Sequence, residues 1–235
     1  MVLQWRPMDR EDVPALVPGT CHIWLLPLEQ EASAYEDLLS PQEKARAERF
    51  VLPQVRNRFI VAHGAMRYWL GHYTHSMPSA VTVAKMETGK PYLLHYPHIH
   101  FNLSHSQHYA LLAVTTIAPV GVDIEMLADN VDSEALVHRF FSSSEQQQFT
   151  QLNPDVKKTA FFNAWCAKEA WVKAHGITLA DGLQQRNIQW SQFGDVENSH
   201  DNDDSRSESC NLPAINGFAS HCLVLGKVDT WQYFR

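Results

Sequence analysis

The stretch Gly121-Val122-Asp123-Ile124-Glu125 decides how the second half of this chain is read. Apolar residues alternate here with two carboxylates, which is the pattern of a half-buried β-strand. Residues two apart in a strand point to the same side, so Asp123 and Glu125 share one face while Val122 and Ile124 face a core. By itself the pattern is more typical of a strand with one solvated edge than of a site.

A second acidic stretch, Trp165-Cys166-Ala167-Lys168-Glu169, lies on a predicted helix over residues 158–174 that ends before Gly176. Glu169 and Lys173 are four residues apart and therefore lie on one helical face. Alone they would read as an exposed ion pair worth about 0.3–0.5 kcal/mol. Three carboxylates on two elements, with a lysine and aromatic residues beside them, indicate instead a site for Mg²⁺, which prefers oxygen ligands.

These two stretches resemble the two signature motifs of the 4′-phosphopantetheinyl transferases. Further motifs of the larger, single-chain class typified by the surfactin-synthetase-activating enzyme are matched upstream. They are Ser40-Pro41, Arg46, Arg49-Phe50, Arg58, Gly89-Lys90-Pro91-Tyr92 and Phe101-Asn102-Leu103-Ser104-His105-Ser106. The resemblance covers residues 39–183, and its specificity lies in the order and spacing of all these pieces together.

The resemblance implies an α+β fold made of two similar halves, residues 1–118 and 119–235, related by a pseudo-twofold axis with the active site in the cleft between them. No identity between the halves is visible in the sequence itself. The implied reaction moves the 4′-phosphopantetheine arm of coenzyme A to a serine of an apo acyl or peptidyl carrier protein and releases adenosine 3′,5′-bisphosphate. Because one chain holds both halves, a monomer is expected.

The resemblance also assigns roles to individual residues. Asp123, Glu125 and Glu169 become the magnesium ligands, and Lys173 contacts the pyrophosphate. Glu169, directly or through a metal-bound water, is the first candidate for the general base, and Glu145 is the second. A coordinated carboxylate is a weak base, which favours the bound water as intermediary. The residues expected to bind coenzyme A are Arg46 and Arg58 at the 3′-phosphate, with Gly89, Lys90, Pro91, Ser104, His105 and Lys173.

Two positions depart from the family pattern. Glu43 stands where a lysine is common, which puts one phosphate contact in question, and His63 stands where an acidic residue is frequent. Around them lies a basic stretch that contains Lys44, Arg46, Arg49, Arg56, Arg58 and Arg67. Without the resemblance this stretch would read as a solvated helix face, and with it as a nucleotide-binding region.

Composition limits the function further. A net charge of −7 argues against a nucleic-acid partner. No apolar run reaches membrane-spanning length and the N-terminus does not read as a secretory signal, so no membrane association is expected. The four cysteines show no paired spacing, which predicts a cytoplasmic protein with free thiols. His95, His98 and His100 suggest zinc ligands, but without nearby cysteines and with Pro97 among them a polar loop is the preferred interpretation.

The predicted elements alternate between strands and helices in each half. Strands are expected near residues 21–26, 81–86, 108–114, 120–125, 217–225 and 230–233, with another ending near Ser104. Helices are expected at residues 41–50, 53–73, 133–140 and 158–174, and from about 143. Residues 191–213 are polar and acidic, and they are predicted to form a mobile surface loop.

Two other functions fit parts of this pattern. A coenzyme A or nucleotide-binding regulator would keep the pocket without turnover. A metal-dependent phosphodiesterase would also use a carboxylate cluster, although it gives no reason for Lys90 or for Ser104-His105.

Overall fold

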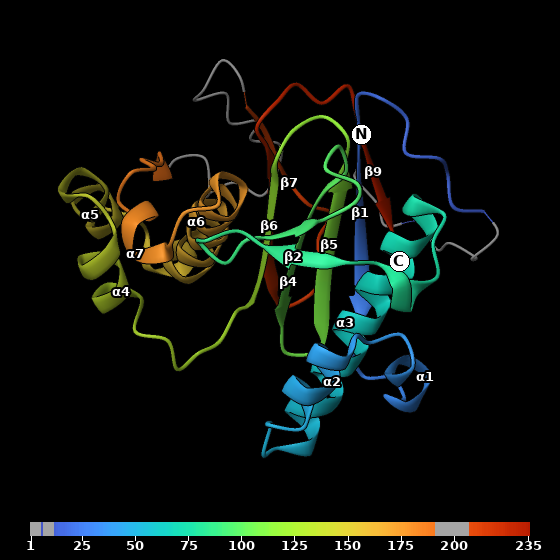
Figure 1. Cartoon of the computed structure of the whole chain (residues 1–235). Coiled ribbons are helices and arrows are strands. Elements are labelled where there is room, and N and C mark those ends of the chain that lie inside the picture. The colour runs from blue at the N-terminus through green and yellow to red at the C-terminus, as the bar shows by residue number, and fades with distance from the viewer. Residues whose placement is uncertain (1–5, 7–11, 191–206) are drawn as a thin grey trace.

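The structure is a computed structural model that describes residue 6, residues 12–190 and residues 207–235. It has the predicted α+β architecture (Figure 1). Its strands are β1 Thr20–Pro27, β2 Val83–Lys85, β3 Pro91–Leu93, β4 His100–Ser106, β5 Tyr109–Thr115, β6 Val120–Met126, β7 Glu208–Asn211, β8 Phe218–Val224 and β9 Thr230–Phe234. Its helices are α1 Ser33–Glu36, α2 Pro41–Ala47, α3 Pro53–Thr74, the short 3₁₀ helix η1 Pro78–Ala80, α4 Ser133–Phe140, α5 Ser143–Thr150, α6 Pro154–His175 and α7 Leu179–Gly182.

Two sheets form the centre of the molecule. The first has the strand order β4-β5-β1-β9, and the second has the order β6-β8-β7. The pairs β4–β5 and β5–β1 are antiparallel, whereas β9 returns from the end of the chain to lie parallel to β1. A two-stranded hairpin, β2–β3, stands apart from both sheets. The C-terminal strand therefore belongs to the sheet of the first half.

Hydrophobic packing arranges these elements in four layers. The helix α3 packs on one face of the first sheet, where Trp24 and Leu112 share a cluster with Val61. The other face of that sheet contributes Ile23 and joins Val122 of the second sheet in another buried cluster. The order is thus α3, first sheet, second sheet and α6, with α6 seen on one side of the sheets and α3 on the other in Figure 1. Burying the inner faces of both sheets on each other stabilises the joint between the halves.

The two long helices repeat one local design, which supports the expected similarity of the halves. Both span 22 residues, begin with proline and end at a left-handed residue, His75 or Gly176. Before each stands a short helix with a capping box, built by Ser40 and Glu43 for α2 and by Ser142 and Glu145 for α5. Each of these glutamates also forms an ion pair with the fifteenth residue of the following long helix. The pairs are Glu43–Arg67 and Glu145–Lys168.

Several element predictions need correction. The helix that carries Glu169 begins four residues earlier than predicted, at Pro154, because the Asn153 side chain accepts a hydrogen bond from the Asp155 N–H and caps it. The predicted loop at 191–213 is wrong over its last part, since Glu208–Asn211 forms β7 and pairs with β8. Its residues 191–206 lie outside the described part of the chain.

The described helices include none with both the length and the apolar character that crossing a membrane requires. The four cysteines are buried and form no disulfide, as predicted. The segment with His95 and His98 forms turns between β3 and β4, in agreement with the preferred interpretation of a loop.

Candidate active site

A polar seam joins the two sheets where the edge strands β4 and β6 meet. Alternate residues of β4 face β6, and each binds a different part of it. Asn102 Oδ1 accepts the Val122 N–H at 2.9 Å, and the Ser104 hydroxyl donates to Asp123 Oδ1 at 2.8 Å. Ser106 closes the row by donating to Glu125 Oε2 at 2.9 Å and accepting the Met126 N–H at 3.1 Å. The motif Phe101–Ser106 therefore positions both carboxylates of the β6 stretch.

Asp123 lies at the centre of the site and is only 1% exposed. Its Oδ1 accepts from the Lys173 ammonium as well as from Ser104, and Lys173 Nζ also lies 3.0 Å from the Ser104 hydroxyl. Its Oδ2 is buried and has no hydrogen-bond partner among the described residues. A solvated strand edge is therefore excluded for Asp123, and one buried carboxylate oxygen remains available for a further ligand.

Glu169 lies on the same face of α6 as Lys173, with its Oε2 at 3.3 Å from the ammonium. Burial raises the pKa of Glu169, and the charge of Asp123 raises it further against the opposing effect of Lys173. Burial and then Asp123 likewise raise the pKa of Glu125 to about 7. Burial alone would lower the pKa of Lys173, but Asp123 and Glu169 raise it above its ordinary value. These residues therefore form one coupled group, and the exposed-pair interpretation of Glu169 and Lys173 is wrong.

Gly121 allows α6 to approach β6 closely. A Cβ atom at this position would overlap Ala170 O and lie 2.5 Å from Ala174 N. These are backbone atoms of α6 on either side of Lys173, so they cannot be moved by a simple rotation of a side chain. The missing side chain of Gly121 thus sets the distance between the strand that carries Asp123 and the helix that carries Lys173 and Glu169.

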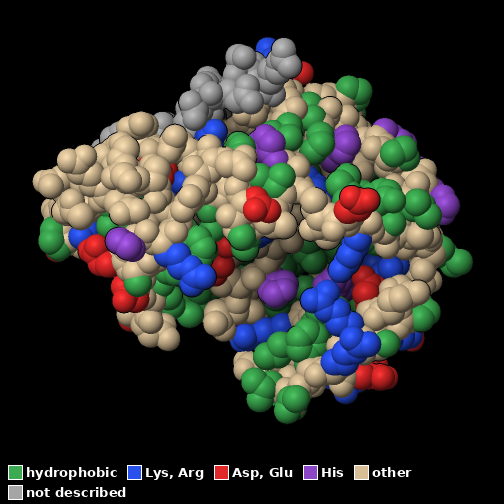
Figure 2. Space-filling view, turned by 60° about the vertical axis from the view of Figure 1, so that its left-hand side comes forward, with side chains coloured by type: hydrophobic (Ala, Val, Ile, Leu, Met, Phe, Trp, Pro, Cys, Tyr) green, Lys and Arg blue, Asp and Glu red, His purple; other side chains and the backbone are tan. Residues whose placement is uncertain are grey.

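The predicted nucleotide-binding residues lie in the first half and only partly come together. Partial burial lowers the pKa of His105, and the nearby His63, Lys173 and Arg46 act in the same direction, so these side chains share one electrostatic environment. Arg46 also stacks over the Phe59 ring, 5.2 Å from its centroid. Figure 2 shows basic and histidine side chains gathered around a hollow on one face of the molecule. Such a surface suits an anionic ligand.

Arg58 binds Gln107 Oε1 at 3.1 Å and Glu29 at 3.5 Å. Its Nε is buried and finds no hydrogen-bond partner in the described part of the chain. Glu43, the departure from the family pattern, points into the protein and pairs with buried Arg67 and with His63. Arg67 is therefore not part of the predicted basic surface. His63, the other position that departs from the family pattern, has a structural role as the second partner of Glu43.

Two predicted site residues are engaged elsewhere. Glu145 is buried and accepts from Lys168, from Ser142 N at 2.6 Å and from Ile188 N at 2.9 Å. It therefore holds a buried ammonium rather than facing Asp123. The Lys90 ammonium bonds to Ala174 O at 2.5 Å and to Val120 O at 3.3 Å, and Gly89 and Pro91 form the turn and strand on either side of it.

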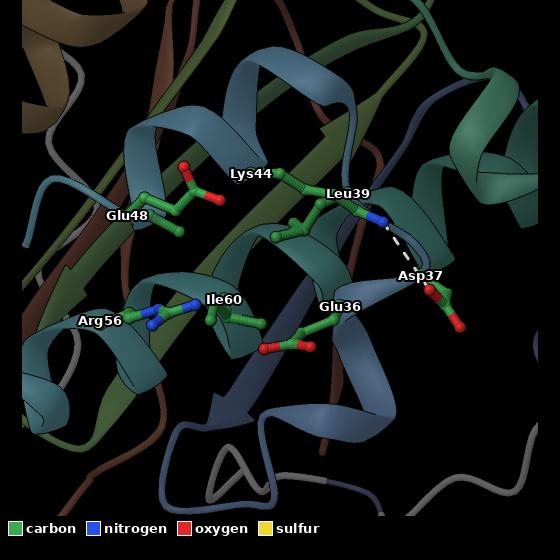
Figure 3. A pocket seen from close by; sticks show the side chains of 8 residues that line it. Glu36, Asp37, Leu39, Lys44, Glu48, Arg56 and Ile60 are labelled. Carbon is green, nitrogen blue, oxygen red and sulfur yellow. Dashed lines mark ion pairs between the residues drawn. The ribbon is translucent and has the colours of Figure 1, made fainter.

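A separate pocket lies between α1, α2 and α3 (Figure 3). Side chains of both charges line it, and the ion pair between Lys44 and Asp37, at 3.7 Å, crosses it. It contains none of the predicted catalytic, metal-binding or coenzyme A-binding residues.

Two neighbours of Asp123 were not expected from the sequence. His221 lies directly opposite Asp123 in the β6–β8 ladder, and burial lowers its pKa to about 3, so it is neutral. Cys166 lies one turn before Glu169 on the buried side of α6, and burial and then Asp123 raise the pKa of its thiol. No local pattern could have identified His221, because its contact depends on the pairing of strands almost 100 residues apart.

The donor chemistry of the site fits Mg²⁺. Asp123, Glu125 and Glu169 offer hard oxygen atoms, and the unpaired Oδ2 of Asp123 is the observation that a cation would explain. Within the described ranges no three acidic, histidine or cysteine side chains already form a metal-binding group. The ammonium of Lys173 instead lies against Asp123 and Glu169. The three-ligand set stays a prediction.

Comparison with known proteins decides the family. A profile described as the 4′-phosphopantetheinyl transferase superfamily matches residues 119–223, and one described as the 4′-phosphopantetheinyl transferase N-terminal region matches residues 24–117. The 4′-phosphopantetheinyl transferase HetI of Nostoc is 39% identical over 171 residues, which cover 70% of this chain and 72% of the relative. The chain belongs to the 4′-phosphopantetheinyl transferase superfamily.

Other members are more distant. The transferase psf-1 of Bacillus pumilus is 32% identical over 66% of this chain and 66% of its own length. The transferase Sfp of Bacillus subtilis is 27% identical over 72% of this chain and 75% of its own length. The predicted family is thus confirmed, while the division into residues 1–118 and 119–235 stays a prediction.

Proposed function

We propose that this chain transfers the 4′-phosphopantetheine arm of coenzyme A to a serine hydroxyl of an apo acyl or peptidyl carrier protein. The observation that carries the proposal is buried Asp123, whose Oδ1 is held by Lys173 and Ser104 while its Oδ2 has no hydrogen-bond partner among residues 12–190 and 207–235. Family membership supplies the reaction class. We also infer a monomer, because one chain matches both family profiles in tandem, and a cytoplasmic location, because the four cysteines are free thiols.

The reaction breaks the bond between the pantetheine phosphorus and the bridging oxygen of the pyrophosphate, and forms a bond from the carrier serine oxygen to that phosphorus. Adenosine 3′,5′-bisphosphate leaves with the bridging oxygen. Asp123, Glu125 and Glu169 would hold Mg²⁺, which when bound offsets negative charge on the phosphate oxygens.

Glu169 is our preferred acceptor of the serine proton. Burial and then Asp123 raise its pKa above the ordinary value of a glutamate, which makes its carboxylate a stronger base. A water bound at the site remains the alternative acceptor. Glu145 is less suited, because its carboxylate is occupied by Lys168 and by two backbone N–H groups.

Lys173 is proposed to balance the negative charge that develops on the leaving phosphate, and its ammonium next to Asp123 supports this role. At the other end of coenzyme A, Arg46 and Arg58 are proposed to hold the 3′-phosphate, and Ser104 and His105 to hold the pyrophosphate. Binding energy from these remote contacts would orient the reacting phosphorus.

The test incubates the protein with coenzyme A, Mg²⁺ and a panel of apo carrier proteins, and follows the intact mass of each carrier. Transfer adds the phosphopantetheine mass to one or more carriers, and Asp123→Asn is expected to abolish it. Binding of coenzyme A without any modified carrier would instead support the non-catalytic regulator. Hydrolysis of a simple phosphodiester without a carrier would support the phosphodiesterase.

A further inference from the structure

The turn of the β2–β3 hairpin in the first half points toward α6 of the second half (Figure 1). Lys90, next to this turn, makes the contact with α6. The Lys90 ammonium donates to Ala174 O at 2.5 Å and to Val120 O at 3.3 Å. Ala174 follows Lys173 on α6, and Val120 begins β6 just before Gly121. One side chain thus binds both elements that carry the site, close to Gly121, where a Cβ atom would meet the backbone of α6.

The last carbonyl groups of a helix lack partners within the helix and carry its partial negative charge. An ammonium at this end satisfies such a carbonyl and compensates the charge. The Lys90 side chain is partly buried, and burial lowers the pKa of its ammonium to about 8. Taking an ammonium out of water is costly, so its two hydrogen bonds to backbone carbonyls matter for the local structure.

The backbone conformation around Lys90 is set by hydrogen bonds within the hairpin turn itself. Gly89 adopts a left-handed φ of 90°, and the turn is closed by hydrogen bonds of 2.9 Å from Gly89 N to Met86 O and from Met86 N to Lys90 O. On α6, Gly176 leaves room for the Lys90 stem, because a Cβ atom there would lie 3.0 Å from Lys90 Cδ. The hairpin turn and the helix end therefore fit each other.

We propose that Lys90 is a positioning residue that ties α6 to β6 and thereby sets the spacing between Lys173 and Asp123. This inference rests on the proposed transfer reaction for its effect on rate. It differs from the coenzyme A contact that the family resemblance implies for this lysine, since the ammonium here is directed at two carbonyl groups of the protein.

The test compares Lys90→Met, which keeps the stem and removes the ammonium, with Lys90→Arg, which keeps donors and charge. Lys85→Met is the matched control, because Lys85 is an exposed lysine on the same hairpin. Three quantities are measured: amide hydrogen exchange over residues 170–177 in the free protein, the calorimetric Kd of coenzyme A, and kcat at saturating coenzyme A and Mg²⁺.

For Lys90→Met we expect exchange over residues 170–177 to become about tenfold faster, because charged hydrogen bonds to the helix end are lost. We expect kcat to fall by at least about tenfold while the Kd of coenzyme A changes less than about threefold. Lys90→Arg should restore most of the protection from exchange and most of the kcat, and Lys85→Met should match the wild type in both. If Lys90→Met does not fold, Lys90→Gln serves in the same comparison.

Unchanged exchange in Lys90→Met would overturn the proposal. A main effect on the Kd of coenzyme A, with kcat retained, would overturn it in favour of a direct ligand contact. Hydrogen exchange needs neither carrier nor turnover. A wrong proposal about the positioning of α6 by Lys90 and a wrong proposal about the transfer reaction can therefore be told apart.

Discussion

Replacing Gly121 by alanine tests whether the close approach of β6 and α6 creates the site. The added Cβ would lie 2.5 Å from Ala174 N and still closer to Ala170 O, whereas ordinary contacts need about 3.5 Å. The helix must therefore move away from the strand by more than about 1 Å, taking Lys173 with it. The contact between Lys173 Nζ and the Ser104 hydroxyl, now 3.0 Å, would then exceed hydrogen-bond length.

We expect Gly121→Ala to lower the free energy of unfolding by about 2 kcal/mol, the cost of an extra methyl group in a packed region. Its kcat/KM for carrier modification should fall about 100-fold, because a shift near 1 Å at reacting groups has effects of that size. Unfolding is measured in urea, and transfer is followed by the mass of the carrier.

Gly217→Ala is the matched control. Gly217 has a left-handed φ of 78°, but an added Cβ would meet no atom within 4 Å among the described residues beyond its chain neighbours. Its replacement should cost about 1 kcal/mol of stability through backbone strain and leave kcat/KM near wild type. If Gly121→Ala kept more than a tenth of wild-type kcat/KM, or lost no more activity than Gly217→Ala, the reasoning about strand–helix spacing would be refuted.

Three further changes test other parts of the structure. Arg58→Ala should raise the KM of coenzyme A but hardly change the KM of a dephospho analogue that lacks the 3′-phosphate. An equal rise in KM for both donors would contradict the proposed role of Arg58. Glu145→Gln should lower the free energy of unfolding by about 3 kcal/mol, because it leaves Lys168 buried without its counter-charge. The kcat of the folded variant should fall less than about tenfold. A complete loss of kcat with normal stability would restore Glu145 as the base. Burial lowers the pKa of His22 to about 4, below its ordinary value of 6.5. Between these two pH values the unfolded chain binds more protons at His22 than the folded chain does. The free energy of unfolding should therefore fall by up to about 3 kcal/mol as the pH drops from 6.5 towards 4. His22→Gln should lack this part of the pH dependence in urea titrations, and an unchanged slope would show that His22 is not its source.

The sequence predicted the local features of the site well. Alternation around Asp123 gave the correct strand and the correct face, and the spacing of Glu169 and Lys173 gave the correct helical face. Both features depend only on the geometry of one element, so they are visible in a short window of sequence.

The partners of these residues were much harder to predict. Lys90 and Glu145 are chemically suited to bind phosphate or to accept a proton, but their side chains are held by Ala174 O and by Lys168. His221 faces Asp123 only because β8 pairs with β6. Such contacts join distant parts of the chain and follow from the tertiary fold, which no local pattern encodes.

The end of the chain shows the same limit. The strand near residues 230–233 was predicted, but its place beside β1 in the sheet of the first half was not. A short strand carries no signal for which edge it will join, because pairing depends on which edge the rest of the fold leaves free.

The repeated helix design described above has a consequence for the number of reactions that one molecule can carry out. Glu169 and Lys173 are the sixteenth and twentieth residues of α6, and the same positions of α3 hold Tyr68 and His72. Each long helix forms an ion pair with the short helix before it, but the two helices differ at these positions. Helix α6 has acidic and ammonium groups there, whereas α3 has aromatic and imidazole groups. A chain with two unequal long helices would therefore hold one set of acidic and ammonium groups, and so one reaction site, per molecule.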